Sequence, residues 1–184
     1  MSMPVLDAIR QRRAVRAYSG KPVDEAAVRS LLEAAVQAPS ANNLQPWSFV
    51  VIQDRKLLHD ISEEAKDALA HDPHWKSHLP LADPAFDIFY GAGTLIVICS
   101  KREGFCPVGD CYLAGQNLML AACAMDLATC PIGLSRDVLQ SPAMKKRLGV
   151  PPEEQPVLPI IVGHAAASMP RTQRVQPKVH AWLR

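Results

Sequence analysis

The sequence predicts one domain in which amphipathic helices alternate with short buried strands. Its 184 residues suit a single domain, expected over 1–184, that is large enough to bury most of its apolar surface. Three short runs of apolar and β-branched residues indicate buried strands at 47–52, 94–99 and 157–163. The segments between them carry apolar residues at helical spacing. Neither an internal repeat nor a linker divides the chain.

The composition argues against several classes of partner. The net charge is only +2 and the basic residues form no stripe, which disfavours binding to nucleic acid. No run approaches the roughly 18 apolar residues of a membrane span, and the first ten residues lack the apolar segment of a secretory signal. The five cysteines are odd in number and scattered, as reduced thiols are. We expect a soluble cytoplasmic protein without membrane or nucleic-acid partners.

The first helix is expected over residues 4–13, and it leads into a cluster of three arginines. Arg12, Arg13 and Arg16 alternate with apolar residues before a Ser-Gly-Lys-Pro turn. They could be the basic end of a helix, favoured by the helix dipole. They could also form a clamp for phosphate or carboxylate oxygens, which the planar guanidinium fork binds well. The residues alone leave both interpretations open.

The second helix is predicted to begin after Asp24 as N-cap and to end at Pro39. Its inward stripe comprises Val28, Leu31, Leu32, Ala35 and Val36. Between Pro39 and Pro46 the chain is rich in short polar side chains, and the two prolines hold it extended or turned. This segment could be a plain surface connection or a binding loop.

A third helix, capped by Asp54, follows the strand at 47–52. The stretch 71–84 then breaks the periodic pattern. It holds three histidines, but Pro73 follows the first of them and we expect no helix that would align them, so no metal site is predicted. A mobile flap that carries Trp75 is the preferred interpretation.

The helix predicted over 110–127 has almost no polar face. A helix that is apolar all round has to be buried on every side, which in a chain of this size indicates a subunit interface. Gly115, Ala121 and Ala122 would let another backbone approach closely. Cys130, which follows this helix, is interpreted as a packing residue because no histidine partner accompanies it.

The last elements are a short helix, a strand and a tail. Ser141, Pro142 and Gly149 give the helix its N-cap, first turn and C-terminal glycine. Pro159 suggests that the strand at 157–163 lies at a sheet edge. From Ala165 the tail has no core pattern and is expected to lie extended across another surface. Phosphate loops of the Walker A or G-x-G-x-x-G type are absent from the sequence.

Three separated segments together resemble the FMN-dependent nitroreductase family. They are residues 12–18 (RRAVRAY), residues 39–47 (PSANNLQPW), and residues 116–117 (QN) followed by 129–133 (TCPIG). The similarity in order and spacing covers nearly the whole chain except 71–89. The resemblance implies a nitroreductase-like α+β fold with a central, mainly antiparallel sheet flanked by helices. It also implies an intertwined homodimer with two FMN sites at the interface.

The resemblance also assigns residues to the flavin site. The arginine segment, which holds the flavin phosphate and ring edge, falls on Arg12, Arg13, Ala14 and Arg16. The polar loop, which reaches the flavin from the other subunit, falls on Pro39, Ser40, Ala41, Asn43 and Gln45. Pro131, Ile132 and Gly133 lie against the isoalloxazine, with a backbone N–H of Ile132 or Gly133 near N5. A further basic residue of the phosphate clamp is Arg171 or Arg174. Many relatives have serine where Ala14 and Leu44 stand, so the hydrogen bonds of those side chains are missing here.

The function implied is that of an NAD(P)H-dependent FMN oxidoreductase. In this ping-pong mechanism NAD(P)H reduces FMN and leaves, and a nitroaromatic, a quinone or a similar acceptor then takes two electrons in the same pocket. No catalytic acid–base pair stands out in the sequence, which suits an enzyme whose protons can come from water. One alternative is a specialised flavin enzyme of the same fold, dehalogenase-like or flavin-destroying. The other is a non-catalytic flavin-binding redox protein. The sequence leaves the physiological substrate open.

Overall fold

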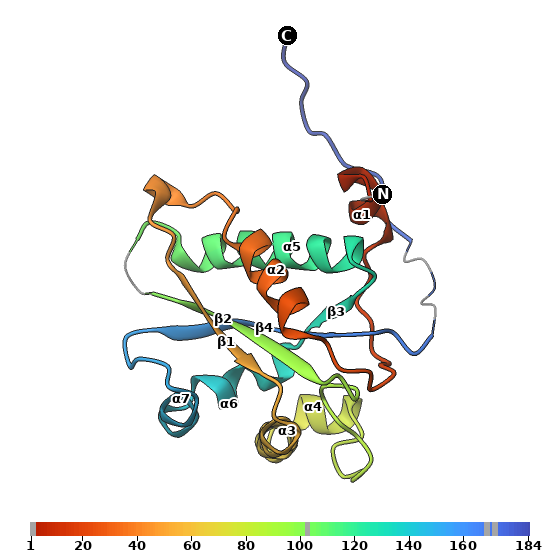
Figure 1. Cartoon of the computed structure of the whole chain (residues 1–184), viewed down its shortest axis with the longest axis vertical. Helices are drawn as coiled ribbons and strands as arrows, with labels where there is room; N and C mark the ends of the chain where they lie inside the picture. Colours follow the sequence, from red (N-terminus) through yellow and green to blue (C-terminus); the bar gives the residue numbers. More distant parts are fainter. Residues whose placement is uncertain (1–2, 102–103, 168–169, 171–172) are drawn as a thin grey trace.

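A four-stranded antiparallel sheet forms the centre of the protein (Figure 1). The computed structural model describes residues 3–101, 104–167, 170 and 173–184. The strands follow the order β1-β2-β4-β3, with bounds β1 Trp47–Ile52, β2 Thr94–Ser100, β3 Ala128–Pro131 and β4 Gln155–Gly163. The α-helices are α1 Val5–Gln11, α2 Glu25–Ala35, α3 Arg55–Ala70, α4 Pro73–His78, α5 Pro107–Ala124, α6 Arg136–Gln140 and α7 Pro142–Leu148. Two 3₁₀ turns, η1 Ala41–Asn43 and η2 Gly133–Ser135, complete the elements of the described residues.

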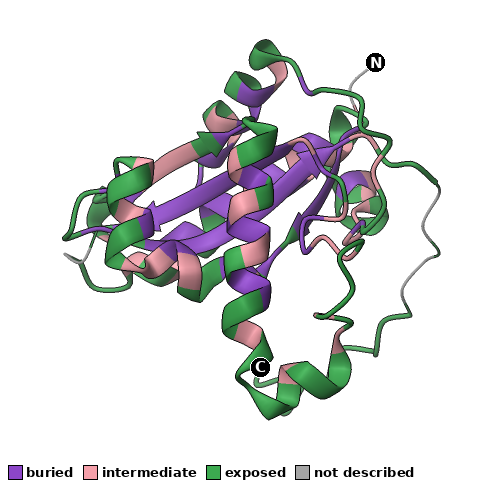
Figure 2. Ribbon diagram, turned by 90° about the horizontal axis from the view of Figure 1, so that it is seen from below, coloured by how far each residue is buried: buried purple, intermediate pink, exposed green. Residues whose placement is uncertain are grey.

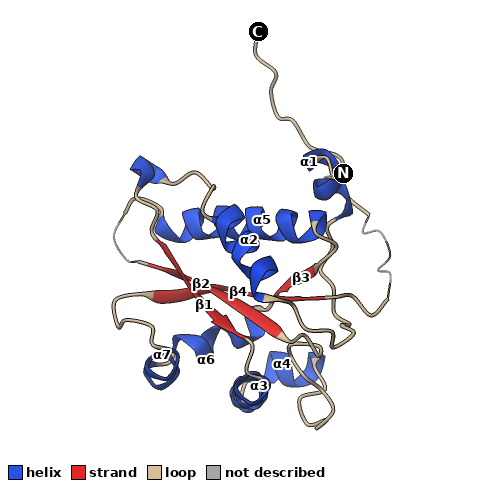
Figure 3. Ribbon diagram, viewed as in Figure 1, coloured by secondary structure: helices blue, strands red, loops and turns tan. Residues whose placement is uncertain are grey.

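The sheet is buried on both faces, because helices cover each side (Figures 1 and 3). Successive residues of β2 point in opposite directions: Ile96 and Ile98 pack into the cluster with α2 and α5, whereas Leu95 and Val97 pack into the cluster with α3. Every residue of β2 is therefore buried, and Figure 2 shows the central strands as a buried layer, whereas the edge strand β1 is largely half-buried. This explains why the strands are continuous apolar runs without alternation.

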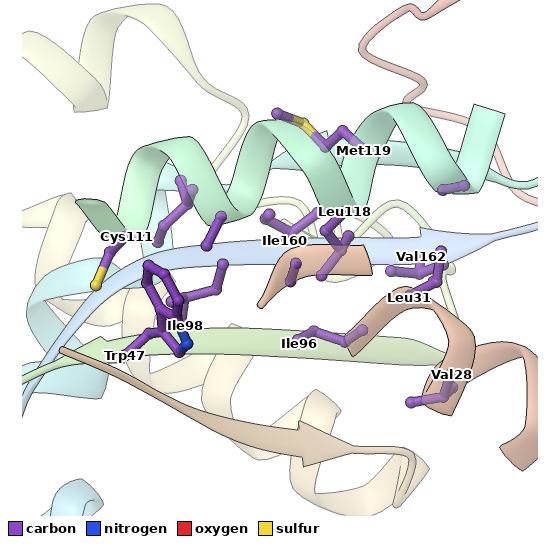
Figure 4. Close-up of a cluster of buried hydrophobic side chains, with 14 of the residues drawn as sticks. Val28, Leu31, Trp47, Ile96, Ile98, Cys111, Leu118, Met119, Ile160 and Val162 are labelled. Carbon is purple, nitrogen blue, oxygen red and sulfur yellow. The ribbon is translucent and has the colours of Figure 1, made fainter. Parts of the chain in front are cut away.

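Helix α5 packs directly on the sheet (Figure 4). A Cβ atom at Gly115 would collide with the Leu158 side chain of β4. This glycine therefore serves packing within the chain, whereas the sequence led us to expect that it would allow the approach of another backbone. The helix is also not buried on every side within one chain. Val108, Tyr112 and Leu113 are between 45% and 47% exposed, which leaves an apolar face without a partner among the described residues.

Local signals in the sequence predicted most element boundaries. The carboxylates of Asp24 and Asp54 accept the N–H groups of Ala27 and Leu57 at 2.7 and 3.0 Å, which confirms both N-caps. At α7, Ser141 caps the first turn, and Gly149 adopts the left-handed conformation with φ of 70°. Helix α5 begins at Pro107, three residues before the predicted start, and α2 ends at Ala35, four residues before Pro39.

The prediction that Pro159 marks an edge strand is wrong, because β4 lies between β2 and β3. Neither β3 nor α6 was predicted. The Pro159 carbonyl accepts the N–H of Ile132 at 2.9 Å, just beyond the last β3 pair, Pro131 with Ile160. Both backbone groups of a residue in an antiparallel strand face the same neighbour, so the missing N–H of Pro159 faces the end of β3. The proline costs one hydrogen bond there and none with β2.

A helix forms where Pro73 led us to expect none. Proline stands at the first position of α4, where its missing N–H costs nothing, and Asp72 caps the helix by accepting the N–H of His74 at 2.8 Å. The helix aligns His74 and His78, whose rings stack with centroids 4.5 Å apart. Among the described residues, no group of three or more His, Cys, Asp or Glu side chains is arranged to hold a metal ion.

No described helix is both long enough and apolar enough to cross a membrane.

Candidate active site

The arginine segment runs along the free edge of β3. The N–H of Val15 donates to the Thr129 carbonyl at 3.1 Å, and Ala14 forms a parallel bridge with Thr129. Further on, the N–H of Ser19 donates to His164 at 2.9 Å. These backbone bonds place residues 12–18 beside the Cys130–Gly133 segment, so two of the three predicted motif regions lie together.

The three arginines have different environments. Nη1 of Arg13 donates to the carbonyls of Arg10 and Arg12 at 2.6 and 2.8 Å, so this side chain caps the end of α1, as the helix-dipole interpretation requires. Arg12 and Arg16 donate no side-chain hydrogen bond to any described residue and have no carboxylate within 4 Å there. Their guanidinium groups are the ones that could bind an anion.

The arginines open onto two neighbouring hollows. Arg12 and Arg13 line a cavity of about 260 Å³ beside Cys123 and Thr129. Arg16 lines another of about 410 Å³, together with Trp75, Tyr90, Arg136 and the Pro131–Leu134 segment. Sequence reasoning missed Tyr90 and Arg136 as lining residues and placed Trp75 only on a flap.

The two backbone donors expected near the flavin are not equivalent. The N–H of Ile132 is occupied, because it donates to the Pro159 carbonyl at 2.9 Å. The N–H of Gly133 makes no hydrogen bond that the described residues show, and a Cβ atom built on Gly133 would meet nothing within 4 Å. Of the two, Gly133 is the backbone group open to a ligand.

The polar loop is rigid and strained. Asn42, Asn43 and Gln45 have positive φ values of 51°, 54° and 47°, which are uncommon for non-glycine residues. Asparagine adopts this conformation more readily than most residues, so the strain is concentrated at Gln45. The Ser40 hydroxyl accepts the N–H of Gln45 at 2.9 Å, and the Gln45 amide donates to Asn43 Oδ1 at 3.2 Å. Strain of this kind is concentrated at functional sites, which favours a binding loop over a plain connection.

One chain does not bring this loop to the arginines. The buried carboxylate of Asp110, near the start of α5, accepts the N–H of Ala41 at 3.2 Å, whereas Arg12 lies beside Cys123 near the end of α5. Asp110 and Cys123 are separated by about 20 Å along a helix that rises 1.5 Å per residue. Figure 1 shows the loop and α1 at opposite ends of α5. Arg174 lies in the exposed tail, and Arg171 lies outside the described residues.

The cysteines give no sign of nucleophilic activation. Burial raises the pKa of the Cys130 thiol despite the opposing effect of Arg16, and Cys130 is only 1% exposed. Burial likewise raises the pKa of Cys99 to about 12 and that of Cys111 to about 11. These values support the packing role expected for Cys130.

Alkylation should distinguish these thiols from the exposed Cys106. At about pH 8 a thiol with a pKa of 11 or above is ionised in roughly one molecule per thousand or fewer, so Cys99 and Cys111 should react with iodoacetamide far more slowly than the exposed Cys106. Burial also raises the pKa of Cys130 and shields its thiol, so this residue should react slowly as well. Peptide mapping by mass spectrometry gives the rates, and the denatured chain, in which all five thiols react alike, is the control. Fast alkylation of Cys130 in the folded protein would contradict its packing role.

Comparison with known proteins agrees with this architecture. A sequence profile of the Nitroreductase family matches residues 9–164. A protein of Archaeoglobus fulgidus with the provisional name NADH dehydrogenase/NAD(P)H nitroreductase is 31% identical over 151 residues, covering 79% of this chain and 76% of its own. The nitrobenzene nitroreductase of Ectopseudomonas oleovorans is 28% identical, covering 91% and 89% of the two chains. The crystal structure of a nitroreductase with bound FMN from Desulfitobacterium hafniense superposes with a TM-score of 0.87 at 25% identity, over 99% of this chain and 100% of the other.

These likenesses confirm the predicted fold, a central antiparallel sheet flanked by helices on both faces. The family profile begins within α1, just before the arginine segment, and ends just after β4, so it includes all three motif segments and the whole sheet. The chain belongs to the nitroreductase family of oxidoreductases.

Proposed function

We propose that the protein binds FMN and uses NAD(P)H to reduce nitroaromatics, quinones or similar acceptors by two electrons in a ping-pong cycle. The observation that carries the proposal is a row of unpaired donors along one edge of the sheet. Arg12 lies beside the start of β3, Arg16 and Gly133 lie at its end, and no described residue accepts from the guanidinium groups of the two arginines or from the N–H of Gly133. The FMN in the Desulfitobacterium structure and the donor in the name of the Archaeoglobus protein support the choice of cofactor and reductant.

The donor set fits FMN. The molecule offers a phosphate, which suits a guanidinium fork, and ring acceptors, which suit N–H donors. We assign the phosphate and ring edge to the segment of Arg12, Arg13, Ala14 and Arg16, in which the guanidinium groups of Arg12 and Arg16 are the ones available to the phosphate, because that of Arg13 caps α1. We assign the ring plane to Pro131, Ile132 and Gly133, and a further phosphate contact to Arg171 or Arg174. When bound, FMN supplies the hydride chemistry, and the protein supplies orientation and charge. The overall reaction with a nitro compound converts NAD(P)H, a proton and the nitro group into NAD(P)⁺, a nitroso group and water.

We further propose a homodimer in which Pro39, Ser40, Ala41, Asn43 and Gln45 of one chain complete the site of the other. The separation of this loop from the arginines within one chain supports the exchange. Apolar side chains that a partner would cover are exposed on α1, on α5 and in the tail: Val5, Leu6, Ile9, Val108, Tyr112, Leu113, Val175, Val179, Trp182 and Leu183. Exposed apolar surface of this extent is typical of an interface.

The direct test is purification followed by assay. We expect a yellow protein that releases FMN on denaturation and oxidises NADH or NADPH when a quinone or nitrobenzene is present. A yellow protein without such oxidation would indicate a flavin-binding redox protein or a specialised enzyme of the same fold. A colourless protein that never binds added FMN would overturn the proposal.

Replacing Arg12 by alanine should weaken FMN binding by about tenfold or more, since a hydrogen bond to a charged group contributes about 1.5–3 kcal/mol. The affinity is measured by the quenching of FMN fluorescence during titration of the apoprotein.

The matched control is Arg10→Ala. It removes a side chain of the same charge from α1, one that is exposed and already paired with Asp7 at 3.2 Å, whereas Arg12 is half-buried and follows the helix. If the Arg12 and Arg10 variants bind FMN equally, the phosphate clamp does not involve Arg12.

A further inference from the structure

The cavity at Pro131–Gly133 has a second wall that lies outside the segments assigned to FMN. Trp75, Tyr90 and Arg136 come from three separate parts of the chain and line it together with Arg16. Two of these side chains are aromatic and two are cationic. The side chains of this wall therefore indicate what kind of molecule the cavity could bind in addition to the cofactor.

Tyr90 is held in a costly conformation. Its φ of 55° is an outlier for a bulky residue, which costs about 1–3 kcal/mol and persists only where the surroundings impose it. The imposing group is Asp87, whose two carboxylate oxygens accept the N–H groups of Phe89 and Gly91, both at 2.9 Å. The Tyr90 N–H donates to the Asp87 carbonyl at 3.0 Å, and the Phe86 ring lies edge-on at 6.4 Å. These contacts hold the backbone of Tyr90 in one conformation at the edge of the cavity, so its ring is available there as a fixed contact surface for a ligand.

Trp75 reaches the same cavity from α4. The helix is capped by Asp72, and the His74 ring packs edge-on against the indole with centroids 4.9 Å apart. Trp75 is half-buried, although the residues around it in α4 are exposed. Tryptophan and tyrosine rings bind flat aromatic molecules through stacked or edge-to-face contacts.

Arg136 gives this wall an unbalanced charge. Its side chain is 53% exposed, and the nearest described carboxylate is 4.0 Å away and belongs to Asp137, whose side chain is 90% exposed. A contact of that length between exposed groups contributes little. The lining contains two arginines and no acidic residue, so the cavity is complementary to an anion. Arg16 belongs to the segment assigned to FMN, which leaves Arg136 for another ligand.

We propose that the electron acceptor is an aromatic molecule with an anionic substituent, a carboxylate above all. Its ring binds against Trp75 and Tyr90, and its anion pairs with Arg136. This inference rests on the proposed reductase function, which it narrows to a class of acceptor. For a nitro-substituted aromatic acid, the nitro group gains two electrons and two protons and loses water, while the carboxylate is unchanged. Arg136 is then a specificity-determining residue and takes no part in the electron transfer.

The test compares 4-nitrobenzoate with its neutral methyl ester on the FMN-loaded protein. The quantity of interest is the ratio of the two kcat/KM values, because the intrinsic reducibility of each compound cancels when variants are compared. We expect Arg136→Gln to lower the ratio of acid to ester by about tenfold, as the loss of a charge-assisted hydrogen bond predicts. Arg29→Gln is the control, since it removes an exposed arginine of α2 that pairs with Glu25 away from the cavity.

A second measurement separates this inference from the proposed function. When NADH and NADPH are left out, neither 4-nitrobenzoate nor its methyl ester is reduced. Isothermal calorimetry then gives the dissociation constant of each compound. Tighter binding of the acid that is lost in Arg136→Gln supports the inference, even if the wild-type protein reduces neither compound and the reductase proposal fails. An unchanged ratio of acid to ester in Arg136→Gln would overturn the inference. So would a variant whose only defect is a raised KM for NADH or NADPH, because Arg136 would then bind the phosphates of the nucleotide.

Discussion

Two variants that each fail to hold FMN are expected to restore one site per dimer when they are combined. The first carries Arg12→Ala and Arg16→Ala and keeps an intact loop. The second carries Asn43→Gly and Gln45→Gly and keeps its arginines. Glycine is chosen because both loop positions have positive φ, which glycine adopts without strain, so the backbone is retained while the polar side chains are lost.

The result follows from which chain completes which site. If the loop acts on the partner's site, the mixed dimer pairs the arginines of the second variant with the intact loop of the first, and that site is whole. If the loop acted within its own chain, both sites of the mixed dimer would be defective. The mixed dimer should therefore hold one FMN if the loop acts on the partner's site, and none if the loop acts within its own chain.

Different affinity tags on the two variants allow the mixed dimer to be isolated after co-expression, and absorbance then gives the FMN content. A dimer of the first variant with the wild-type chain is the control, because it should hold one FMN under either arrangement. A mixed dimer of the two variants that holds no FMN, while this control holds one, would show that the loop does not serve the partner.

The elements that could be predicted from the sequence are those fixed by nearby residues. The capping side chains of Asp24, Asp54 and Ser141 each accept the N–H of the residue three positions on, and all three caps form as expected. The strands at β1, β2 and β4 could be recognised because both faces of the sheet are covered, which makes each a continuous apolar run.

The failures concern features that only the tertiary structure decides. β3 has four residues and ends in Pro131, too short and too irregular for a periodic signal. The central position of Pro159 depends on where β3 stops, which the local sequence does not reveal. The failure at Pro73 is of another kind because the signal is local: proline is favourable at the first position of a helix, and Asp72 stands directly before it as the cap.

The candidate site was predictable in part for the same reason. The resemblance located the arginine segment, the polar loop and residues 131–133, because each is contiguous. The wall formed by Trp75, Tyr90 and Arg136 was not predicted, since these residues meet only after α3, α4 and β3 have packed. A signal did exist at 87–91, where an aspartate followed four residues later by a glycine suits a tight side-chain-capped turn.

Removal of residues 173–184 is expected to convert the dimer into monomers at micromolar concentration. The described tail contains no helix or strand, and its apolar side chains Val175, Val179, Trp182 and Leu183 are 95%, 60%, 75% and 93% exposed. Burial of such a side chain contributes about 1.5–3 kcal/mol, so two tails per dimer would change the dissociation constant by several orders of magnitude. Figure 1 shows the tail directed away from the rest of the chain, as an arm that packs on a partner would be. Sedimentation velocity measures the dimer, and absorbance measures the FMN that it retains.

Two controls separate the interface from the flavin contact, because the truncation also removes Arg174. The single variant Arg174→Ala should leave the dimer intact, and it should lower FMN affinity only if Arg174 belongs to the phosphate clamp. Trp182→Ala with Leu183→Ala should weaken the dimer while leaving every arginine in place, and its FMN loss should follow dissociation as the protein is diluted. A truncated protein that stays dimeric and keeps its full FMN content would show that the tail lies on neither the partner nor the cofactor.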